Sequence, residues 1–517
     1  MPDKVQILIA MCCYIAIVIG IGLHYARRAN ESSDNYLIGG RTLGPWVTAM
    51  GAEASDMSGW LLMGLPGVAY WYGLSDAVWT GIGLLVGTYL NWLFVSKRLR
   101  NYTVVANDSI TIPDFFSNRF KEDKKVLMTI AALFILIFFT VYAASCFVTV
   151  GKLFNTLFDI KYQYMMVAGA LFVIGYTFIG GFLAESASDF MQGIIMFVSL
   201  VAVLFTGITH AGGFSAMLDN VAAFPGFLEF FGIANPTMTD GVQGINSSGA
   251  PLFGEASPYV GLTVISTLSW GLGYFGMPQV LMKFMAIKNP GDLKLSRRIA
   301  VIWCTISLGA AVIIGIIGRS LYPTAFGTQG GAESVFVLLS TNFFVPLFAG
   351  VVMAGILAAT ISSSDSYLLI AAGAFSKCIY QGIMRKEASD RTVLHVSRVT
   401  LVVIALCAMI IAMDENSIIF TVVSFAWAGF GATFGPIMLF SLFWKRTTRG
   451  GAIAGMLSGA GMVFLWKLVL KPMGGGFAIY ELFPAFMVSC LFIVVVSLFT
   501  KEPSREIQEE FEQVRNF

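Results

Sequence analysis

Long runs of apolar residues recur along the whole chain, and short polar stretches separate them. A run of about 20 apolar residues can cross the hydrocarbon core of a membrane as a helix. A transmembrane β-barrel would instead show alternating apolar and polar positions. The pattern therefore predicts an all-α polytopic membrane protein with thirteen transmembrane helices. They fall near residues 5–26, 42–73, 75–96, 126–156, 162–183, 187–211, 258–286, 296–321, 333–377, 394–413, 417–444, 450–470 and 478–500.

Composition agrees with the membrane class and excludes several functions. Of the 517 residues, 57% are hydrophobic and 12% are charged, whereas a soluble domain carries about 25% charged residues. The net charge of +2 argues against a nucleic-acid partner. The seven cysteines lack metal-binding spacing, and no phosphate-binding loop supports ATP-driven transport. Because no nucleophile–base pair stands out either, we do not expect an enzyme.

The basic residues predict how the helices are oriented. An odd number of spans places the two termini on opposite sides of the membrane. With the N-terminus outside, the inner regions hold 26 of the 32 Lys and Arg residues, Lys283 among them, and the outer loop 212–257 holds none. Cytoplasmic loops are enriched in Lys and Arg, so we expect an N-out, C-in protein of the plasma (inner) membrane. The charged tail 501–517 is expected to be solvated.

Residues 51–64, GAEASDMSGWLLMG, interrupt an apolar segment with two acids and three glycines. Each glycine weakens a helix interior by about 1 kcal/mol relative to alanine. A break in a membrane helix frees backbone groups that need partners, and an ion or a substrate supplies them. We therefore favour a binding site here. A re-entrant bend, or acids at the cytoplasmic surface of the membrane, would also fit the pattern.

A second polar cluster, ATISSSDS at 359–366, lies inside the segment 333–377. Four small residues of this cluster share one helix face: Ala359, Ser362, Ser363 and Ser366. Asp365 adds a carboxylate beside them. Hydroxyl and carboxylate oxygens suit a hard cation, and by analogy they suit sodium. The alternative is close helix packing, which small residues also allow.

Two further places carry polar or helix-breaking residues. Asp189 stands at the start of segment 187–211, and charged residues at membrane depth are functional candidates; a simple interfacial acid is the alternative. Residues 268–280, LSWGLGYFGMPQV, combine glycines and a proline with aromatic side chains. Apolar walls with a few polar groups describe a small-molecule pocket, and membrane packing with an aromatic anchor is the alternative.

The second and seventh segments are therefore both interrupted, and they run in opposite directions. Interrupted segments at corresponding positions of two inverted halves point to a transporter binding site. The predicted division is an extra N-terminal helix and linker at 1–40, a first repeat at 41–211, an extracellular loop at 212–257, a second repeat at 258–444, two C-terminal helices at 445–500 and a cytoplasmic tail at 501–517.

Several long motifs resemble those of the solute:sodium symporter family, and of its sodium/proline symporters in particular. They are ASDMSGWLLMGLPG (54–67), YLIGGRTLGP (36–45), YTFIGGFLA (176–184), WGLGYFGMPQ (270–279) and FAWAGFGATFGP (425–436). The resemblance extends over nearly the whole chain. It implies the five-plus-five inverted-repeat fold, also called the leucine-transporter fold, and Na+ as the co-transported ion.

Matched residue by residue, the resemblance implies roles for specific positions. The main sodium site would use three backbone carbonyls and two hydroxyls, those of Ala54, Met57, Ala359, Ser362 and Ser363. Asp56 matches an acid that is important for sodium coupling, and Asp189 matches an acid on the ion's inward exit route. The substrate would lie near six residues: Ser58, Trp60, Tyr142, Trp270, Tyr274 and Pro278. Tyr142 matches the family's aromatic gate over the substrate.

The chain departs from the family pattern at several positions. Ile361-Ser362-Ser363 stands where the proline symporters have methionine-serine-threonine. Glu53 and Asp365 stand where the proline symporters have uncharged residues, and Met277 stands where they have glutamine. In sialic-acid-transporting relatives, a serine pair near positions 365 and 366 can hold a second sodium facing the acid at position 189. We therefore hypothesise a second cation site with four residues: Asp189, Ser362, Asp365 and Ser366. Glu53 has no assigned role.

Taken together, the sequence predicts a sodium-coupled secondary active symporter that imports L-proline by alternating access. The alternative is a sodium- or proton-coupled symporter for another small amino acid or carboxylate-bearing solute, with Glu53 and Asp365 as proton carriers. A sensor is disfavoured, because the short tail leaves no room for a signalling module. The expected partners are the substrate, sodium and membrane lipid, with no nucleic acid and no obligatory protein partner.

Overall fold

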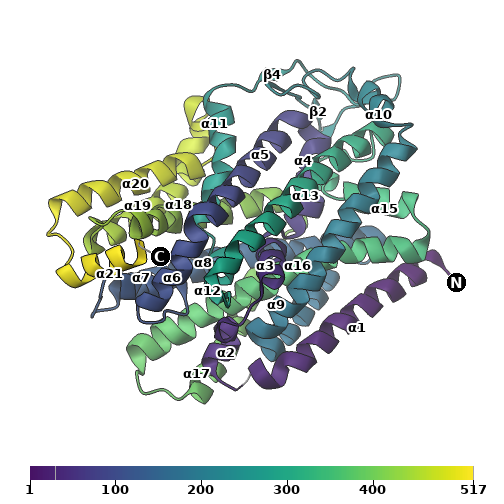
Figure 1. Cartoon of the computed structure of the whole chain (residues 1–517). Helices are drawn as coiled ribbons and strands as arrows, with labels where there is room; N and C mark the ends of the chain where they lie inside the picture. The colour runs from purple at the N-terminus through teal and green to yellow at the C-terminus, as the bar shows by residue number, and fades with distance from the viewer. Residues whose placement is uncertain (30, 516–517) are drawn as a thin grey trace.

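In the computed structural model, which describes residues 1–29 and 31–515, long helices form a bundle with an irregular loop at one end (Figure 1). The helices of the first half are α1 (Asp3–Ala29), α2 (Ser33–Ile38), α3 (Pro45–Asp56), α4 (Leu65–Tyr72), α5 (Leu74–Leu90), α6 (Ser96–Val105), α7 (Ile112–Arg119), α8 (Val126–Phe158), α9 (Tyr162–His210) and α10 (Phe214–Val221). Those of the second half are α11 (Leu262–Leu268), α12 (Pro278–Ala286), α13 (Leu293–Leu321), α14 (Gln329–Ala332), α15 (Val335–Phe343), α16 (Pro346–Gly373), α17 (Asp390–Ile411), α18 (Ile419–Phe443), α19 (Arg449–Leu465), α20 (Leu482–Phe499) and α21 (Arg505–Arg515).

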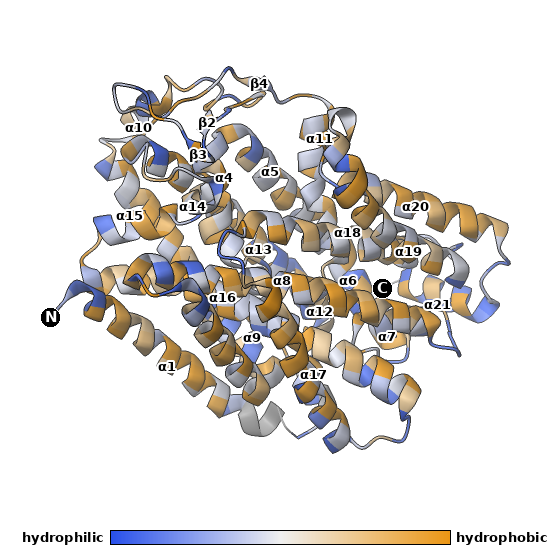
Figure 2. Cartoon of the chain, turned by 180° about the vertical axis from the view of Figure 1, so that it is seen from behind, coloured by the Kyte–Doolittle hydropathy of each residue, from blue (hydrophilic) through white to orange (hydrophobic). Residues whose placement is uncertain are grey.

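The exterior of the bundle is apolar, as a membrane protein requires. Among the described residues, ten helices are long and apolar enough to cross a membrane. Apolar residues dominate α1, α17 and α20 (Figure 2), and Leu23, Ile410 and Phe499 on these three helices are exposed. The helical, multi-pass membrane class predicted from the sequence is confirmed.

The predicted loop 212–257 carries α10 and the short strands of the structure. β1 (Gly232–Ile233) pairs antiparallel with β4 (Ser257–Pro258), and β2 (Met238–Thr239) pairs antiparallel with β3 (Val242–Gln243). Figure 1 shows these strands above the ends of α4 and α5.

Both predicted helix breaks are present. After α3, the backbone at Met57 is non-helical (φ −80°, ψ 72°), and a π-helical turn at Trp60–Gly64 leads into α4. After α11, 3₁₀-helical turns at Ser269–Gly276 lead to α12, which begins at Pro278. Proline suits the first position of a helix because no amide hydrogen is needed there. The second and seventh predicted segments are thus pairs of half-helices.

The predicted segments 162–183 and 187–211 correspond to two helices of α9 that meet at a kink, at the non-helical backbone of Gly181 (φ 59°, ψ −170°). Glycine adopts this conformation at little steric cost. The segment 333–377 is divided differently from the prediction. Pro346 begins α16, and α14 and α15 precede it as separate short helices.

The tail 501–517 is not merely a solvated end. Its helix α21 buries Ile507, Phe511 and Val514 and packs against α6. The guanidinium of Arg98 on α6 lies 5.0 Å from the centroid of the Phe511 ring. The apolar spacing i, i+4, i+7 is that of an amphipathic helix, so this docking was readable from the sequence.

Helix α16 is the buried centre of the bundle. It packs against α1, α3, α8 and α9, and its residues from Val352 to Gly373 are all buried. The polar cluster at 359–366 therefore lies inside the protein and away from lipid. Each of its hydroxyls must find a partner within the bundle, because no water is available in the hydrocarbon.

Helix α5 approaches the second break backbone to backbone. A Cβ atom added to Gly87 would lie 2.2 Å from the carbonyl oxygen of Gly271, and one added to Gly83 would lie 2.6 Å from the carbonyl oxygen of Leu268. Gly81, on the same helix, has no atom within 4 Å of such a Cβ. The glycines at 83 and 87 let α5 support the interrupted segment directly.

We predict that Gly87→Ala lowers the free energy of unfolding by about 2 kcal/mol, because overpacking a close contact has a cost of that order. Thermal unfolding of the purified protein in detergent measures the effect, and Gly81→Ala is the matched control. Equal melting temperatures for the two variants would contradict the close approach.

Candidate ion and substrate site

The first break frees a backbone carbonyl in α3. The Met57 amide still donates to the Glu53 carbonyl (2.8 Å), as in a helix, but the Ser58 amide donates to the Asp56 carbonyl (2.9 Å). In a continuous helix the Ser58 amide would donate to the carbonyl of Ala54. The break therefore takes the Ser58 amide away from the Ala54 carbonyl. That carbonyl then needs another hydrogen-bond donor or a cation.

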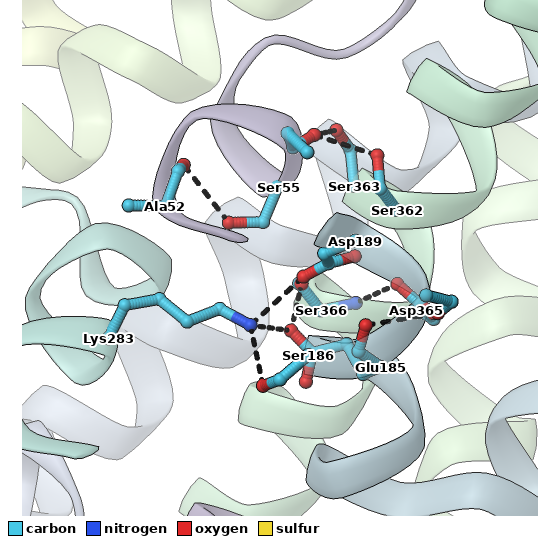
Figure 3. A network of polar contacts seen from close by, with 12 residues as sticks. Ala52, Ser55, Glu185, Ser186, Asp189, Lys283, Ser362, Ser363, Asp365 and Ser366 are labelled. Atoms are coloured by element: carbon cyan, nitrogen blue, oxygen red, sulfur yellow. Dashed lines mark hydrogen bonds and ion pairs between the residues drawn. The ribbon is translucent and has the colours of Figure 1, made fainter. Parts of the chain in front are cut away.

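Hydroxyl groups of α16 reach this freed carbonyl. Ser362 Oγ donates to the Ala54 carbonyl at 2.7 Å, and Ser363 Oγ lies 3.4 Å from the same oxygen. Ser362 Oγ also lies 3.2 Å from the Ala359 carbonyl. Figure 3 shows the two serines together beside α3. Four of the five predicted sodium ligands thus converge, and Met57, the fifth, is buried one turn further along.

This group of oxygens has the chemistry that a sodium ion needs. Its members are uncharged carbonyl and hydroxyl oxygens, which are the kind of ligand atom that hard cations bind. They come from α3 and from α16, which are far apart in the chain. A cation held between them would link the two helices, and its positive charge would replace the hydrogen bonds that the serine hydroxyls now make.

The carboxylate of Asp56 bridges to the second break. Tyr274 Oη donates to Asp56 Oδ2 at 2.9 Å, and Gln279 Nε2 donates to Asp56 Oδ1 at 3.0 Å. Asp56 thereby joins the two interrupted segments, one from each half of the chain. Its role in sodium coupling stays a prediction. Sequence reasoning missed Gln279, although a polar residue beside the helix-starting Pro278 is the signal that would have found it.

Aromatic rings surround the two breaks. The rings of Tyr142 and Tyr367 lie 4.3 Å apart, and those of Tyr274 and Trp427 lie 5.0 Å apart in an edge-to-face arrangement. Tyr142 Oη lies 3.5 Å from the Asp56 carbonyl. Sequence reasoning missed Tyr367 of α16 and Trp427 of α18, because only the fold shows that their rings pack against Tyr142 and Tyr274.

The six predicted substrate residues form two neighbouring groups, one around Asp56 and one at the second break. Tyr142 and Tyr274 contact Asp56, and Ser58 and Trp60 follow Asp56 in the first break. Trp270 and Pro278 flank the second break. The Trp270 carbonyl accepts from Trp427 Nε1 at 2.8 Å, and the Trp270 ring stacks on Tyr480 at 4.9 Å. The aromatic rings therefore continue from one group to the other.

A buried ion-pair network lies beside the predicted sodium ligands (Figure 3). Lys283 Nζ of α12 lies 2.9 Å from Glu185 Oε1 and 2.9 Å from Asp189 Oδ2, and it donates to Ser186 Oγ at 3.0 Å. All three partners belong to α9. The Lys283 side chain is only 1% exposed, although the charge distribution counted it among the basic residues of the inner regions. Sequence reasoning missed this network.

The four residues of the hypothesised second cation site make other contacts. Asp189 is paired with Lys283, and Ser362 donates to the Ala54 carbonyl. The hydroxyl of Ser366 donates to Glu185, while its amide donates to Asp365 Oδ1 at 2.8 Å. The second cation site therefore stays a prediction, and Lys283 is a neighbour that the prediction did not include.

The carboxylate of Glu53 links α3 to neighbouring helices by hydrogen bonds. Its Oε1 atom accepts from Trp92 Nε1 at 3.2 Å, and its Oε2 atom accepts from Cys304 Sγ at 2.7 Å. Trp92 follows α5 and Cys304 lies on α13. The acid that departs from the family pattern thus ties α3 to two neighbouring helices through two donors that have no charge.

We predict that Glu53→Gln destabilises the fold but leaves sodium affinity unchanged. Glutamine keeps one acceptor oxygen and turns an amide NH2 group towards the other donor, so one hydrogen bond is lost at about 1–3 kcal/mol. Thermal unfolding and the sodium concentration for half-maximal uptake measure the two effects. Glu387→Gln, at an exposed position, is the control. Weakened sodium dependence with an unchanged melting temperature would show that Glu53 acts on the ion.

Known proteins match the chain over most of its length. The model of the sodium:solute symporter family matches residues 36–459. The osmoregulated proline transporter OpuE of Bacillus subtilis (strain 168) is 39% identical over 503 residues, which are 97% of this chain and 96% of that protein. The sodium/proline symporter of Staphylococcus aureus (strain JH9) is 38% identical over 517 residues, which are 99% of this chain and 96% of that protein.

Solved structures share the fold. A substrate-bound, outward-open sodium-coupled sialic acid symporter has a TM-score of 0.75 at 17% identity, covering 97% of this chain and 99% of that chain. MhsT in complex with L-phenylalanine has a TM-score of 0.52 at 14% identity, covering 88% of this chain and 98% of that chain. The leucine-transporter type of fold is thereby confirmed.

The resemblance seen in the sequence motifs thus extends to a family model that covers most of the chain, to relatives of nearly equal length and to the overall fold. The relatives are transporters, and the apolar helices make this a multi-pass membrane protein of the same kind. The chain belongs to the sodium:solute symporter family.

Proposed function

We propose that this protein imports L-proline together with sodium by alternating access. The observation that carries the proposal is the contact between α16 and the broken helix, where Ser362 Oγ meets the freed Ala54 carbonyl at 2.7 Å. A sodium ion bound there, with Met57, Ala359 and Ser363 as further ligands, ties the two helices together. Membrane potential then adds about 2.3 kcal/mol per charge per 100 mV to the drive for import.

Proline is the substrate that the relatives favour, since both proline transporters are 38–39% identical to this chain over nearly its full length. The site agrees with a small solute that has an apolar ring and charged groups. Aromatic walls from Trp60, Tyr142 and Tyr274 supply the apolar surface, and Ser58 supplies a hydroxyl. We place Trp270 and Pro278 at the edge of the same proposed substrate site.

Coupling follows from the contacts of Asp56. Its carboxylate holds Tyr274 and Gln279 of the second break, while its own helix ends beside the sodium ligands. Sodium binding therefore positions the substrate's walls, and the substrate in turn stabilises the ion site. Each ligand shifts the protein towards the conformation that it binds better, and the two affinities must change by the same factor. We also propose that Asp189 of α9 lies on the ion's inward exit route, the role that the sequence resemblance implies.

We also propose the thirteen-span, N-out and C-in topology. Ten helices of the described residues are long and apolar enough to span. Helix α9 has 49 residues, about 73 Å of helix, which is more than twice the hydrocarbon thickness of about 30 Å and counts as two spans. The two pairs of half-helices, α3–α4 and α11–α12, add one span each. The distribution of Lys and Arg supports the orientation.

Uptake into proteoliposomes tests the proposed substrate and ion. An inward sodium gradient is expected to drive accumulation of labelled proline, and unlabelled proline in millimolar excess is expected to abolish it. A panel of other amino acids and sugar acids tests the alternative substrates. If unlabelled proline fails to compete, the substrate assignment is wrong. If a proton gradient drives uptake without sodium, the ion assignment is wrong.

We predict that Ser362→Ala and Ser363→Ala each raise the sodium concentration for half-maximal proline uptake by about tenfold, because each variant lacks one oxygen ligand of the ion. A tenfold change corresponds to about 1.4 kcal/mol. Ser364→Ala is the matched control, since Ser364 Oγ donates within α16 to the Thr360 carbonyl at 2.5 Å. A similar loss of sodium affinity in all three variants would indicate a general effect on α16 instead of a sodium site.

A further inference from the structure

The ammonium group of Lys283 lies deep in the bundle, and the fold makes room for it. The lysine starts on α12 and passes α3 at Gly51, where an added Cβ atom would lie 3.4 Å from Nζ and 3.5 Å from Cε. It ends at Glu185 and Asp189 on α9. A side chain any larger than alanine at position 51 would occupy the path of the lysine.

The three hydrogens of the ammonium group are all used. Glu185 Oε1 and Asp189 Oδ2 each lie 2.9 Å from Nζ, and Ser186 Oγ lies 3.0 Å from it. The ring of Phe182 faces the same group, with its centroid 4.7 Å from Nζ. An ammonium has three donors and no acceptor, so this site satisfies it fully. Such pairing is required because an unpaired buried charge is costly.

One oxygen of each neighbouring carboxylate binds this ammonium, namely Glu185 Oε1 and Asp189 Oδ2. Three further carboxylate oxygens of the cluster are buried without a hydrogen-bond partner among the described residues: Glu185 Oε2, Asp189 Oδ1 and Asp365 Oδ2. Asp189 holds the lysine, and Glu185 bridges from the lysine to the Ser366 hydroxyl. Asp365 accepts from the Ser366 amide. Figure 3 shows the lysine reaching from one side to Glu185, Ser186 and Asp189 of α9, with Asp365 and Ser366 of α16 beyond them. Two residues of the hypothesised second sodium site are thus linked to a cation that belongs to the protein, Asp189 directly and Ser366 through Glu185.

We propose that the Lys283 ammonium is a tethered cation that takes the place of a second co-transported sodium. An ammonium and a sodium ion carry the same charge, and both bind oxygen. A cation fixed to the chain stays with the protein during transport, so only the sodium at Ala54 and Ser362 is carried with the substrate. This inference rests on the proposed function, and it replaces the hypothesised second sodium site with a residue of the chain.

The number of bound sodium ions tests the inference. Binding of radioactive sodium to the purified full-length protein, with saturating proline, is expected to give one ion per protein and a Hill coefficient of about 1. Lys283→Gln removes the ammonium and leaves its carboxylates without a cation. This variant is expected to bind two sodium ions, with a Hill coefficient clearly above that of the native protein.

Two variants control for charge and for folding. Lys283→Arg keeps the charge and is expected to bind one ion. Lys288→Gln removes a positive charge at an exposed position five residues away and is also expected to bind one. Thermal unfolding establishes which variants are folded. If Lys283→Gln does not fold, the ion counts of the native protein and of Lys283→Arg still test the inference, because two sodium ions bound to either of them would contradict it.

Two results would overturn the inference. Two sodium ions bound to the native protein would mean that the carboxylates, Asp365 among them, recruit a metal although Lys283 is present. One ion bound to folded Lys283→Gln would mean that lysine does not occupy a sodium position. Failure of the proposed function is a separate outcome, because a native protein that binds no sodium would contradict the symport mechanism itself.

Discussion

A backbone carbonyl buried in a membrane protein must have a partner, and the carbonyl of Ala54 has lost its helical one. The break at Met57 and Ser58 diverts the amide that would have served it. In water such a group would be solvated, but within the bilayer it costs several kcal/mol unless the protein or an ion satisfies it. The structure places Ser362 of α16 at that point. This requirement accounts for the hydroxyl of Ser362 on the buried face of α16.

The same break organises the rest of the site. Because α3 ends at Asp56, the carboxylate can turn to the second half of the chain and bind Tyr274 and Gln279. Tyr142 and Tyr367 close over the breaks from α8 and α16. Some of the predicted ion ligands, some of the predicted substrate residues and the link between the two halves therefore share the short stretch of chain from Ala54 to Trp60. Anything that pulls α3 towards α16 also moves the groups that face the substrate, which is the physical basis for coupling.

The sequence was informative wherever the signal was local. Glycines, a proline and acids inside apolar segments predicted both breaks, and the spacing of Ser362 and Ser363 predicted their common face. What the sequence could not give were partners from distant segments, such as Gln279 for Asp56. Lys283 lies near the end of a predicted segment, where a charge usually indicates an interface, and only the fold shows that its side chain is buried and reaches α9. The kink that divides α9 lies at Gly181, and the polar residues Glu185 and Asp189 that follow it bind Lys283.

The most direct test of the account is the reciprocity between the two ligands at this site. Sodium affinity of the purified protein is measured with and without saturating proline, and proline affinity is measured with and without saturating sodium. The account predicts that each ligand strengthens the other and that the two factors are equal. A sodium affinity that proline leaves unchanged would contradict the claim that the break in α3 joins the ion to the substrate.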